Sequence, residues 1–137
     1  MIKLSRMTDY AVMVLSIMAQ DDKKQYSTAY LASETGLNEP TVAKILKLLV
    51  RHDILVSKRG SLGGYSFLKN TDTINMANIL EAIEGQIALV DCVDHTKDCC
   101  DKADHCQIKG KWDPLNMAIQ RMFEEMSLKQ MLGGRTA

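Results

Sequence analysis

The segment "LASETGLNEPTVAKILKLLVRHDILVSKRGSLGGYSFL", residues 31–68, decides the fold. It begins with two short helical patterns that are separated by a tight turn. Gly36 suits the end of the first helix, Asn38 suits the N-cap of the second, and Pro40 falls in the first turn, where a missing N–H costs little. The apolar residues that follow recur at helical spacing and predict one buried stripe: Val42, Ile45, Leu46 and Leu49.

A glycine-rich hairpin is predicted directly after these helices. Residues 54–68 read as two short strands around a loop that holds three glycines and basic residues at its tip. Helix pairs alone are common, but a helix pair followed by a basic hairpin is typical of a winged helix-turn-helix. The expected fold is mainly α with a small β-hairpin wing, namely a winged helix-turn-helix plus a long C-terminal dimerisation helix.

The flanking segments also predict helices. Apolar spacing within residues 5–20 predicts a first helix, and Asp9 interrupts the apolar run, so this stretch does not read as a signal peptide. Ser27 is a candidate N-cap for the helix before Gly36. A further helix is expected between a cap near Asn75 and a stop at Gly85.

The C-terminal part of the chain carries a heptad-like seam. Its members alternate between spacings of three and four residues: Trp112, Leu115, Ile119, Met122 and Met126. A lone helix cannot bury such a stripe, so the seam predicts a partner helix from a second copy of the chain. A homodimer is therefore expected.

These patterns divide the chain into five parts. The expected organisation is a winged helix-turn-helix DNA-binding domain over 1–70, a connecting helix and short apolar segment over 71–91, a cysteine loop over 92–106, a dimerisation helix and docking segment over 107–132, and a disordered tail over 133–137. No stretch approaches the roughly 20 apolar residues that span a bilayer. A cytoplasmic protein with reduced thiols and no membrane partner is expected.

The charge is distributed unevenly along the chain. The net charge is zero, but residues 1–70 carry a net charge of +4 and residues 71–137 one of −4. A basic front half is compatible with double-stranded DNA as partner. The candidate DNA-contacting residues lie on the second helix of the motif and in the wing: Asn38, Glu39, Thr41, Lys44, Lys47, Lys58, Arg59 and Gly60. The alternative reading is a solvated helix face, with glycines that simply permit a hairpin.

All four cysteines lie in one polar segment, "CVDHTKDCCDKADHC", residues 92–106, which we call the cysteine segment. Six residues separate Cys92 from Cys99, and five separate Cys100 from Cys106. Paired C-x2-4-C knuckles, which structural zinc prefers, are missing from this spacing. A wide loop with several thiolates favours a metal or an iron–sulfur cluster, ahead of a thiol switch and of inert cysteines.

Several of these stretches together resemble a known family. "RMTDYAV" near the start, residues 31–65 through the wing, the cysteine segment ahead of a long helix, and "SLKQML" near the end are similar to the iron–sulfur-cluster-binding winged-helix regulators, the family of IscR and NsrR. The resemblance covers nearly the whole chain. It implies a transcription factor that senses a 2Fe–2S or 4Fe–4S cluster.

The resemblance also implies a ligand set. Three thiolates are expected, from Cys92, Cys106 and one of the middle pair. The interval that the family uses favours Cys100, although Cys99 fits the first interval almost as well. Asp9 stands where the nitric-oxide-sensing members have an aspartate that reaches the cluster from the partner subunit.

Other candidates for the fourth ligand remain. The assembly repressors have a histidine three residues beyond the last cysteine, and here that position is Lys109. His95 and His105 in the cysteine segment are alternative ligands. Asp9 also has a simpler reading, because a carboxylate in the first turn favours a helix by itself.

The implied function is control of cluster-assembly genes of the SUF type, with a nitric-oxide-sensing repressor as the alternative. Two other classes are kept open. One is a metal-free cysteine redox switch, and the other is a cluster carrier or cluster-dependent enzyme whose helix-turn-helix is only structural. The sequence holds no catalytic constellation and no phosphate loop, so an enzyme is not expected.

Overall fold

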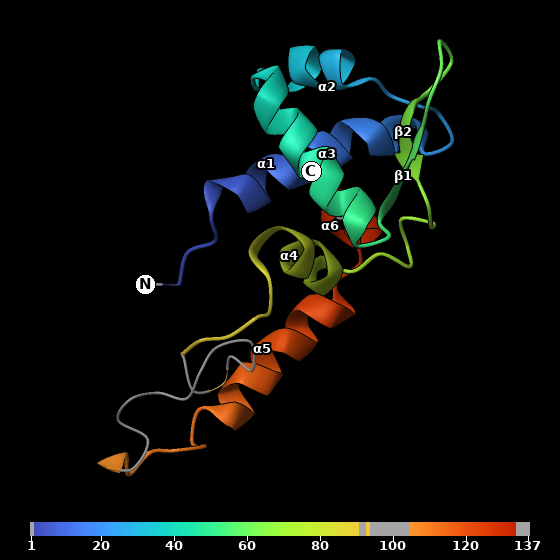
Figure 1. Cartoon of the computed structure of the whole chain (residues 1–137). Helices are drawn as coiled ribbons and strands as arrows, with labels where there is room; N and C mark the ends of the chain where they lie inside the picture. The colour runs from blue at the N-terminus through green and yellow to red at the C-terminus, as the bar shows by residue number, and fades with distance from the viewer. Residues whose placement is uncertain (1, 91–92, 94–104, 134–137) are drawn as a thin grey trace.

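The computed structural model describes residues 2–90, 93 and 105–133. In that part the chain is mainly helical, with one antiparallel hairpin, as the sequence predicted (Figure 1). The elements follow one another as α1 (Arg6–Met18), the 3-10 turn η1 (Ala19–Asp21), α2 (Thr28–Thr35), α3 (Glu39–Arg51), β1 (Leu55–Lys58), β2 (Gly64–Phe67), α4 (Met76–Glu84), α5 (Asp113–Glu125) and α6 (Leu128–Gly133).

The helix starts are set by local capping. The hydroxyl of Ser27 accepts from the N–H of Tyr30 at 3.1 Å and caps α2, which ends at Gly36 in the left-handed conformation with φ of 77°. Asn75 and Asn78 form a reciprocal capping box at the start of α4. Such caps satisfy N–H groups that have no partner inside the helix, and this is why short polar residues locate the boundaries.

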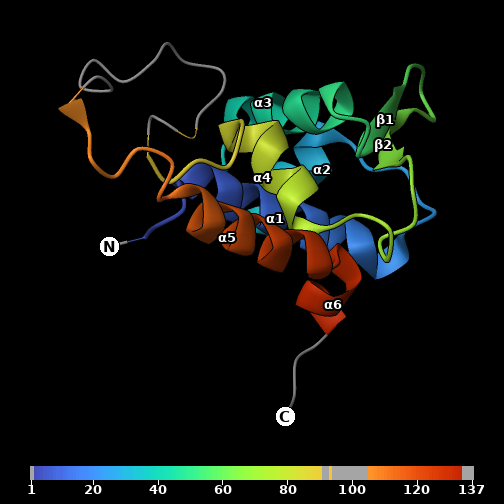
Figure 2. The ribbon, with the colours of Figure 1, turned by 90° about the horizontal axis from the view of Figure 1, so that it is seen from below.

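The core lies where α1 meets the other helices of the amino-terminal half. The α3 stripe predicted from the sequence is fully buried, and so are residues of α1, α2 and α4 that pack with it: Val14, Leu15, Met18, Leu31 and Ile79. Burial of one such side chain stabilises the fold by about 1.5–3 kcal/mol. Figure 2 shows α1 beneath α3 and α4 in this view, and α1 contacts both helices.

The hairpin is extended by a third short segment. In β1 and β2, Leu55 pairs with Phe67 and Lys58 pairs with Gly64. Tyr26 and Tyr65 exchange two backbone hydrogen bonds of 2.8 Å, so the chain just before α2 pairs with the outer side of β2. A Cβ at Gly64 would lie 2.6 Å from the carbonyl oxygen of Tyr26, and its φ is +143°. Gly64 is therefore needed for this close pairing, beyond permitting a hairpin.

The C-terminal helices cross back to the start of α4. Trp112 is the N-cap of α5 and Met126 its C-cap, so the predicted seam spans the whole helix. Beyond α5, the N–H of Leu128 donates to the carbonyl of Ile74 at 2.7 Å, and the Leu128 side chain is buried. The C-terminal segment thus packs on the core, and Gly133, which the sequence assigned to the tail, is the last residue of α6.

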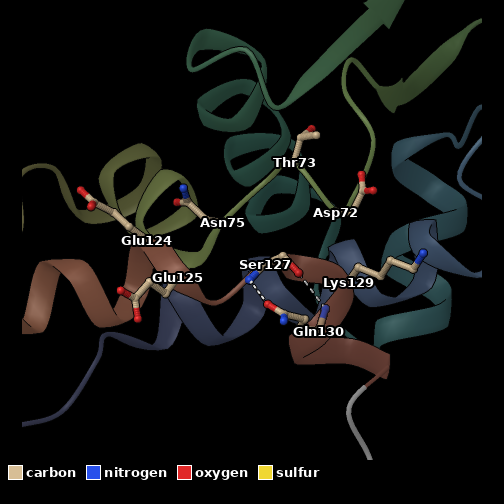
Figure 3. Close-up of a pocket in the computed structure, with 8 residues that line it drawn as sticks. All are labelled: Asp72, Thr73, Asn75, Glu124, Glu125, Ser127, Lys129 and Gln130. Atoms are coloured by element: carbon tan, nitrogen blue, oxygen red, sulfur yellow. Dashed lines mark hydrogen bonds between the residues drawn. The ribbon is translucent and has the colours of Figure 1, made fainter.

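A second capping box explains the turn into α6. The N–H of Ser127 donates to Oε1 of Gln130, and the N–H of Gln130 donates to the Ser127 hydroxyl, both at 3.0 Å (Figure 3). The polar hollow beside this turn, about 350 Å³, is lined by these two residues and by Asn75, which already caps α4. Glu124 and Glu125 point away from Lys129 there. We assign this hollow a structural role.

None of the helices in the described part of the chain is long and apolar enough to cross a bilayer.

Candidate nucleic-acid interface and cysteine segment

One side of α3 carries a basic stripe that consists of Lys44, Lys47 and Arg51. All three side chains are exposed, at spacings of three and four residues, opposite the buried face of the same helix. Residues so spaced lie on one face of a helix. The stripe therefore presents a row of positive charge, as phosphate binding requires.

The start of α3 limits what Asn38 can contact. Its Oδ1 accepts a 2.8 Å hydrogen bond from the N–H of Thr41, which is the N-cap interaction. The amide NH₂ of Asn38 takes no part in this cap and can donate to a base edge. Glu39 is exposed and Thr41 is half-buried. Contacts from these residues to DNA bases stay predictions.

The wing places its basic residues at the tip of the hairpin. Lys58 ends β1, Arg59 and Gly60 follow it, and all three are exposed. The N–H of Gly63 donates to the carbonyl of Gly60 at 3.0 Å and closes the turn. The hairpin stands out from one end of the bundle, so its tip is free to approach a groove (Figure 1).

An aromatic and cationic cluster lies beside the wing, and the sequence analysis missed it. The Lys24 ammonium lies 5.5 Å from the ring centroid of Tyr26 and 5.6 Å from that of Tyr30. Burial raises the pKa of Tyr26, whose hydroxyl donates to the carbonyl of Asp21 at 3.2 Å. The sequence indicates this cluster only by two tyrosines close to a lysine. It does not show that Tyr26 packs against β2, because that contact depends on the tertiary fold. Cation–π contact holds Lys24 near the start of α2.

Of the cysteine segment, the structure describes Val93, His105 and Cys106. Cys106 is a free, exposed thiol, and His105 and Lys109 are also exposed. Cys92, Cys99, Cys100 and His95 lie outside the described residues. Among the residues that are described, no three His, Cys, Asp or Glu side chains come together in a geometry that could hold a metal ion.

Asp9 lies in the first turn of α1 and is exposed. Its N–H donates to the carbonyl of Ser5 at 3.3 Å as part of the helix start. The Asp9 side chain is exposed in the single chain. The ligand role of Asp9 stays a prediction.

The chain that leads into the cysteine segment is held by a buried side chain of α5. Oδ1 of Asn116 accepts from the N–H of Leu89 at 2.9 Å, and its Nδ2 donates to the carbonyl of Ile87 at 3.2 Å. The sequence analysis did not single out Asn116. The sequence feature that could have indicated Asn116 is a polar residue one helical turn after Trp112, next to the apolar seam.

An apolar groove of about 680 Å³ runs beside this contact, between the N-terminal residues, the end of α4 and α5. Its apolar walls include Ile2, Leu4, Leu80, Ile119, Met122 and Phe123. Met122 is 68% exposed, and Leu115 and Met126 of the same helix are also exposed. A contiguous exposed apolar surface of this kind is typical of a protein interface.

Comparison with known proteins identifies the family of this chain. The sequence model of the Rrf2 family, described as iron-dependent transcriptional regulators, matches residues 4–134. The chain belongs to the Rrf2 family. The NsrR regulator of Halalkalibacterium halodurans, an HTH-type transcriptional regulator, is 24% identical to this Rrf2 chain over 131 residues, 95% of this chain and 90% of the relative.

Solved structures share the fold of this Rrf2 protein. CymR, the global cysteine regulator of B. subtilis, superposes with a TM-score of 0.75 at 20% identity, over 99% of this chain and all of CymR. IscR of T. potens superposes with a TM-score of 0.71 at 21% identity, over 99% of this chain and 93% of IscR. These likenesses confirm the winged-helix fold with its C-terminal helix.

Membership in the Rrf2 family settles the class of function. The chain is a DNA-binding transcriptional regulator and not an enzyme, as the sequence predicted.

Proposed function

We propose that this Rrf2 regulator is a homodimer whose operator binding is controlled by an iron–sulfur cluster, and that it regulates cluster-assembly genes. The observation that carries the proposal is the placement of every thiol of the chain in residues 92–106. That segment leads into α5, which begins at Asp113 and carries the exposed apolar side chains. A group bound there would link the thiols to the helix that we assign to dimerisation.

The donor chemistry fits such a group. Thiolates are the usual ligands of iron–sulfur clusters, and Cys106 is free and accessible. We assign Cys92, Cys100 and Cys106 as ligands, with Cys99 as the alternative to Cys100. Asp9 of the partner subunit is our choice for the fourth ligand. When bound, a 2Fe–2S or 4Fe–4S cluster supplies a centre that responds to oxidants or nitric oxide.

The DNA-binding half acts through charge and shape. Lys44, Lys47 and Arg51 neutralise phosphates beside the major groove, and the first turn of α3 faces the base edges. Arg59 at the wing tip enters the adjacent minor groove, where the negative potential is enhanced. This assignment follows the proposed division of the chain, with residues 1–70 as the DNA-binding domain.

A second copy covers the exposed face of α5. Pairing of two α5 helices buries Leu115, Met122 and Met126, which are exposed in one chain. The pair then sets two α3 helices about one DNA turn apart over a near-palindromic operator. Changes at the cysteine segment bias the population of dimers that fit this spacing.

The test is purification without oxygen. We expect a coloured protein with a thiolate-to-iron absorption band and equal amounts of bound iron and sulfide. Cys106→Ala should abolish the band, whereas Cys99→Ala, which leaves the better-spaced Cys100, should keep most of it. Operator binding should change when the cluster is removed. A colourless parent protein that carries no iron would overturn the proposal.

A metal-free thiol switch is the second candidate. The observation that favours it is the exposed Cys106 thiol in a segment with three further cysteines. In that case the iron-free protein binds its operator, and a mild oxidant changes the affinity in a thiol-dependent manner. Cys106→Ser would then remove the response without any effect on bound iron.

A further inference from the structure

Asn116 is polar, yet it is the one buried residue of α5. It is 7% exposed, and both halves of its amide are used. Oδ1 accepts from the N–H of Leu89 and Nδ2 donates to the carbonyl of Ile87. One side chain thereby satisfies a backbone donor and acceptor, as a neighbouring strand would.

These two hydrogen bonds connect segments that are distant in sequence. They span 27 and 29 residues and join the chain after α4 to α5. In the sequence, Leu89 precedes the first cysteine and Asn116 follows the last one, so the whole cysteine segment lies between the two ends of this contact. Val93, inside the cysteine segment, is buried, and its N–H donates to the carbonyl of Val90 at 3.2 Å.

We infer that Asn116 is a positioning residue for the cysteine segment: it fixes residues 87–89 on α5, so that the N-terminal end of the segment starts from the same helix into which the chain leads after the last cysteine. The inference rests on the proposed cluster function and deepens it. Groups that orient metal ligands without touching the metal commonly change metal affinity by 10–100-fold when they are removed. Asn116 would act in this way through the backbone rather than through a ligand side chain.

Two substitutions separate the parts of the contact. Asn116→Leu has similar volume and removes both hydrogen bonds. Asn116→Asp keeps an acceptor for Leu89, but its carboxylate faces the carbonyl of Ile87 and cannot donate. Protonation restores a donor, so the Asn116→Asp defect should shrink as the pH is lowered.

Asn78→Ala is the matched control. It removes the hydrogen bond from the Asn75 N–H to Asn78 Oδ1 and so weakens the start of α4 without touching residues 87–89. It therefore lowers the melting temperature through the same helix bundle. A purely structural role for Asn116 would make Asn116→Leu and Asn78→Ala behave alike once their melting temperatures are taken into account.

The experiment has one arm without cluster and one with it. In the iron-free protein, the exchange of the Leu89 amide hydrogen, followed by NMR, should be at least about tenfold faster in Asn116→Leu than in the parent or in Asn78→Ala. In the anaerobically loaded protein, the visible absorption should decay under air about tenfold faster in Asn116→Leu, and at the parent rate in Asn78→Ala.

Failure of the positioning role and failure of the proposed cluster function would give different results. If the parent binds iron and Asn116→Leu loses its absorption at the parent rate, the positioning role is wrong. The same holds if Asn78→Ala accelerates the loss equally. A parent that binds no iron overturns the proposed function, and the role of Asn116 falls with it. Should Asn116→Leu fail to fold, Asn116→Asp decides through its pH dependence, and a defect that does not shrink at lower pH overturns the inference.

Discussion

The backbone N–H of Ser5 donates a 2.6 Å hydrogen bond to Oε1 of Glu84 and thereby ties the start of α1 to the end of α4. Ser5 is also the N-cap of α1, since its hydroxyl accepts from the N–H of Thr8 at 3.3 Å. In a capping box the side chain three residues after the cap would satisfy the Ser5 N–H. Here that residue is Thr8, and a carboxylate from a distant helix takes the role.

This contact predicts a pH dependence of stability. Partial burial raises the pKa of Glu84, but hydrogen bonds from Ser5 and Thr8 outweigh it, and the net pKa lies below its ordinary value. The contribution of the carboxylate is therefore complete above the unfolded-state pKa and is lost as the pH falls through the folded-state pKa. We expect Glu84→Gln to cost at most about 1 kcal/mol at neutral pH, with the difference vanishing in acid. Urea unfolding of both proteins across this pH range measures it, and a constant difference would contradict the assignment.

The wing prediction concerns Arg59. We expect Arg59→Ala to weaken operator binding by about 1–3 kcal/mol, the scale of one good groove contact. The slope of log affinity against log salt should also become shallower, because a charge that displaces counterions is lost. Lys129→Ala on α6 is the control, since it removes an exposed charge from another part of the chain. An equal loss in both variants would remove Arg59 from the interface.

Much of the DNA-binding half could be predicted from the sequence because its signals are local. Ser27, Asn38 and Asn75 cap the helices that they precede, and each bonds to an N–H three residues further on. Gly36 ends α2 for an equally local reason. The stripe of α3 is buried because helical periodicity alone places it on one face.

Two contacts that were not predicted from the sequence join distant segments. Glu84 meets Ser5 across 79 residues, and Asn116 meets Leu89 across 27. No spacing rule connects such pairs, since their approach depends on how whole helices pack. The cysteine segment is the reverse case: its composition is clear in the sequence, and of its four cysteines only Cys106 lies among the described residues.

The α5 prediction concerns Met122. We expect Met122→Glu to shift the protein to monomers and abolish operator binding, because a charge would be buried at an apolar interface at a cost of several kcal/mol. Met122 is a sharper choice than Ile119, which is half-buried in its own chain. Arg121→Glu, an exposed position about 100° around the helix, is the control. Sedimentation velocity gives the answer, and a Met122→Glu dimer would place the interface elsewhere.

A stability prediction comes from the turn after α3. Asp53 has a φ of 60°, in the left-handed backbone region that residues other than glycine rarely adopt. The N–H of Ile54 donates to the carbonyl of Leu49 at 3.0 Å across this turn, so the conformation is needed to end the helix. We expect Asp53→Gly to raise the free energy of unfolding by up to about 1 kcal/mol, and Asp53→Val to lower it. Thermal unfolding of the iron-free protein tests both, and a destabilised Asp53→Gly would contradict the argument.

The last prediction concerns the fourth ligand. A carboxylate binds iron less tightly than a thiolate does, so we expect Asp9→Ala to form a cluster that decays faster under oxygen or nitric oxide than that of the parent. Asp9→Glu should fall between them. The exposed first turn of α1 holds Asp9 at solvent, so its loss should leave the fold of the single chain intact. This separates it from Cys106→Ala, which removes a thiolate that no neighbouring group replaces.

A ligand from the partner subunit would make cluster binding depend on dimerisation, whereas a ligand from the cysteine segment of the same chain would not. If Asp9 of the partner completes the site, then monomers produced by Met122→Glu should hold the cluster as poorly as Asp9→Ala, and combining the two changes should add nothing. His105→Ala is the matched control, since His105 is exposed in the cysteine segment of the same chain. Should His105→Ala alter the absorption spectrum while Asp9→Ala matches the parent, the fourth ligand comes from within the chain. The dimer would then position the DNA-binding halves without completing the metal site.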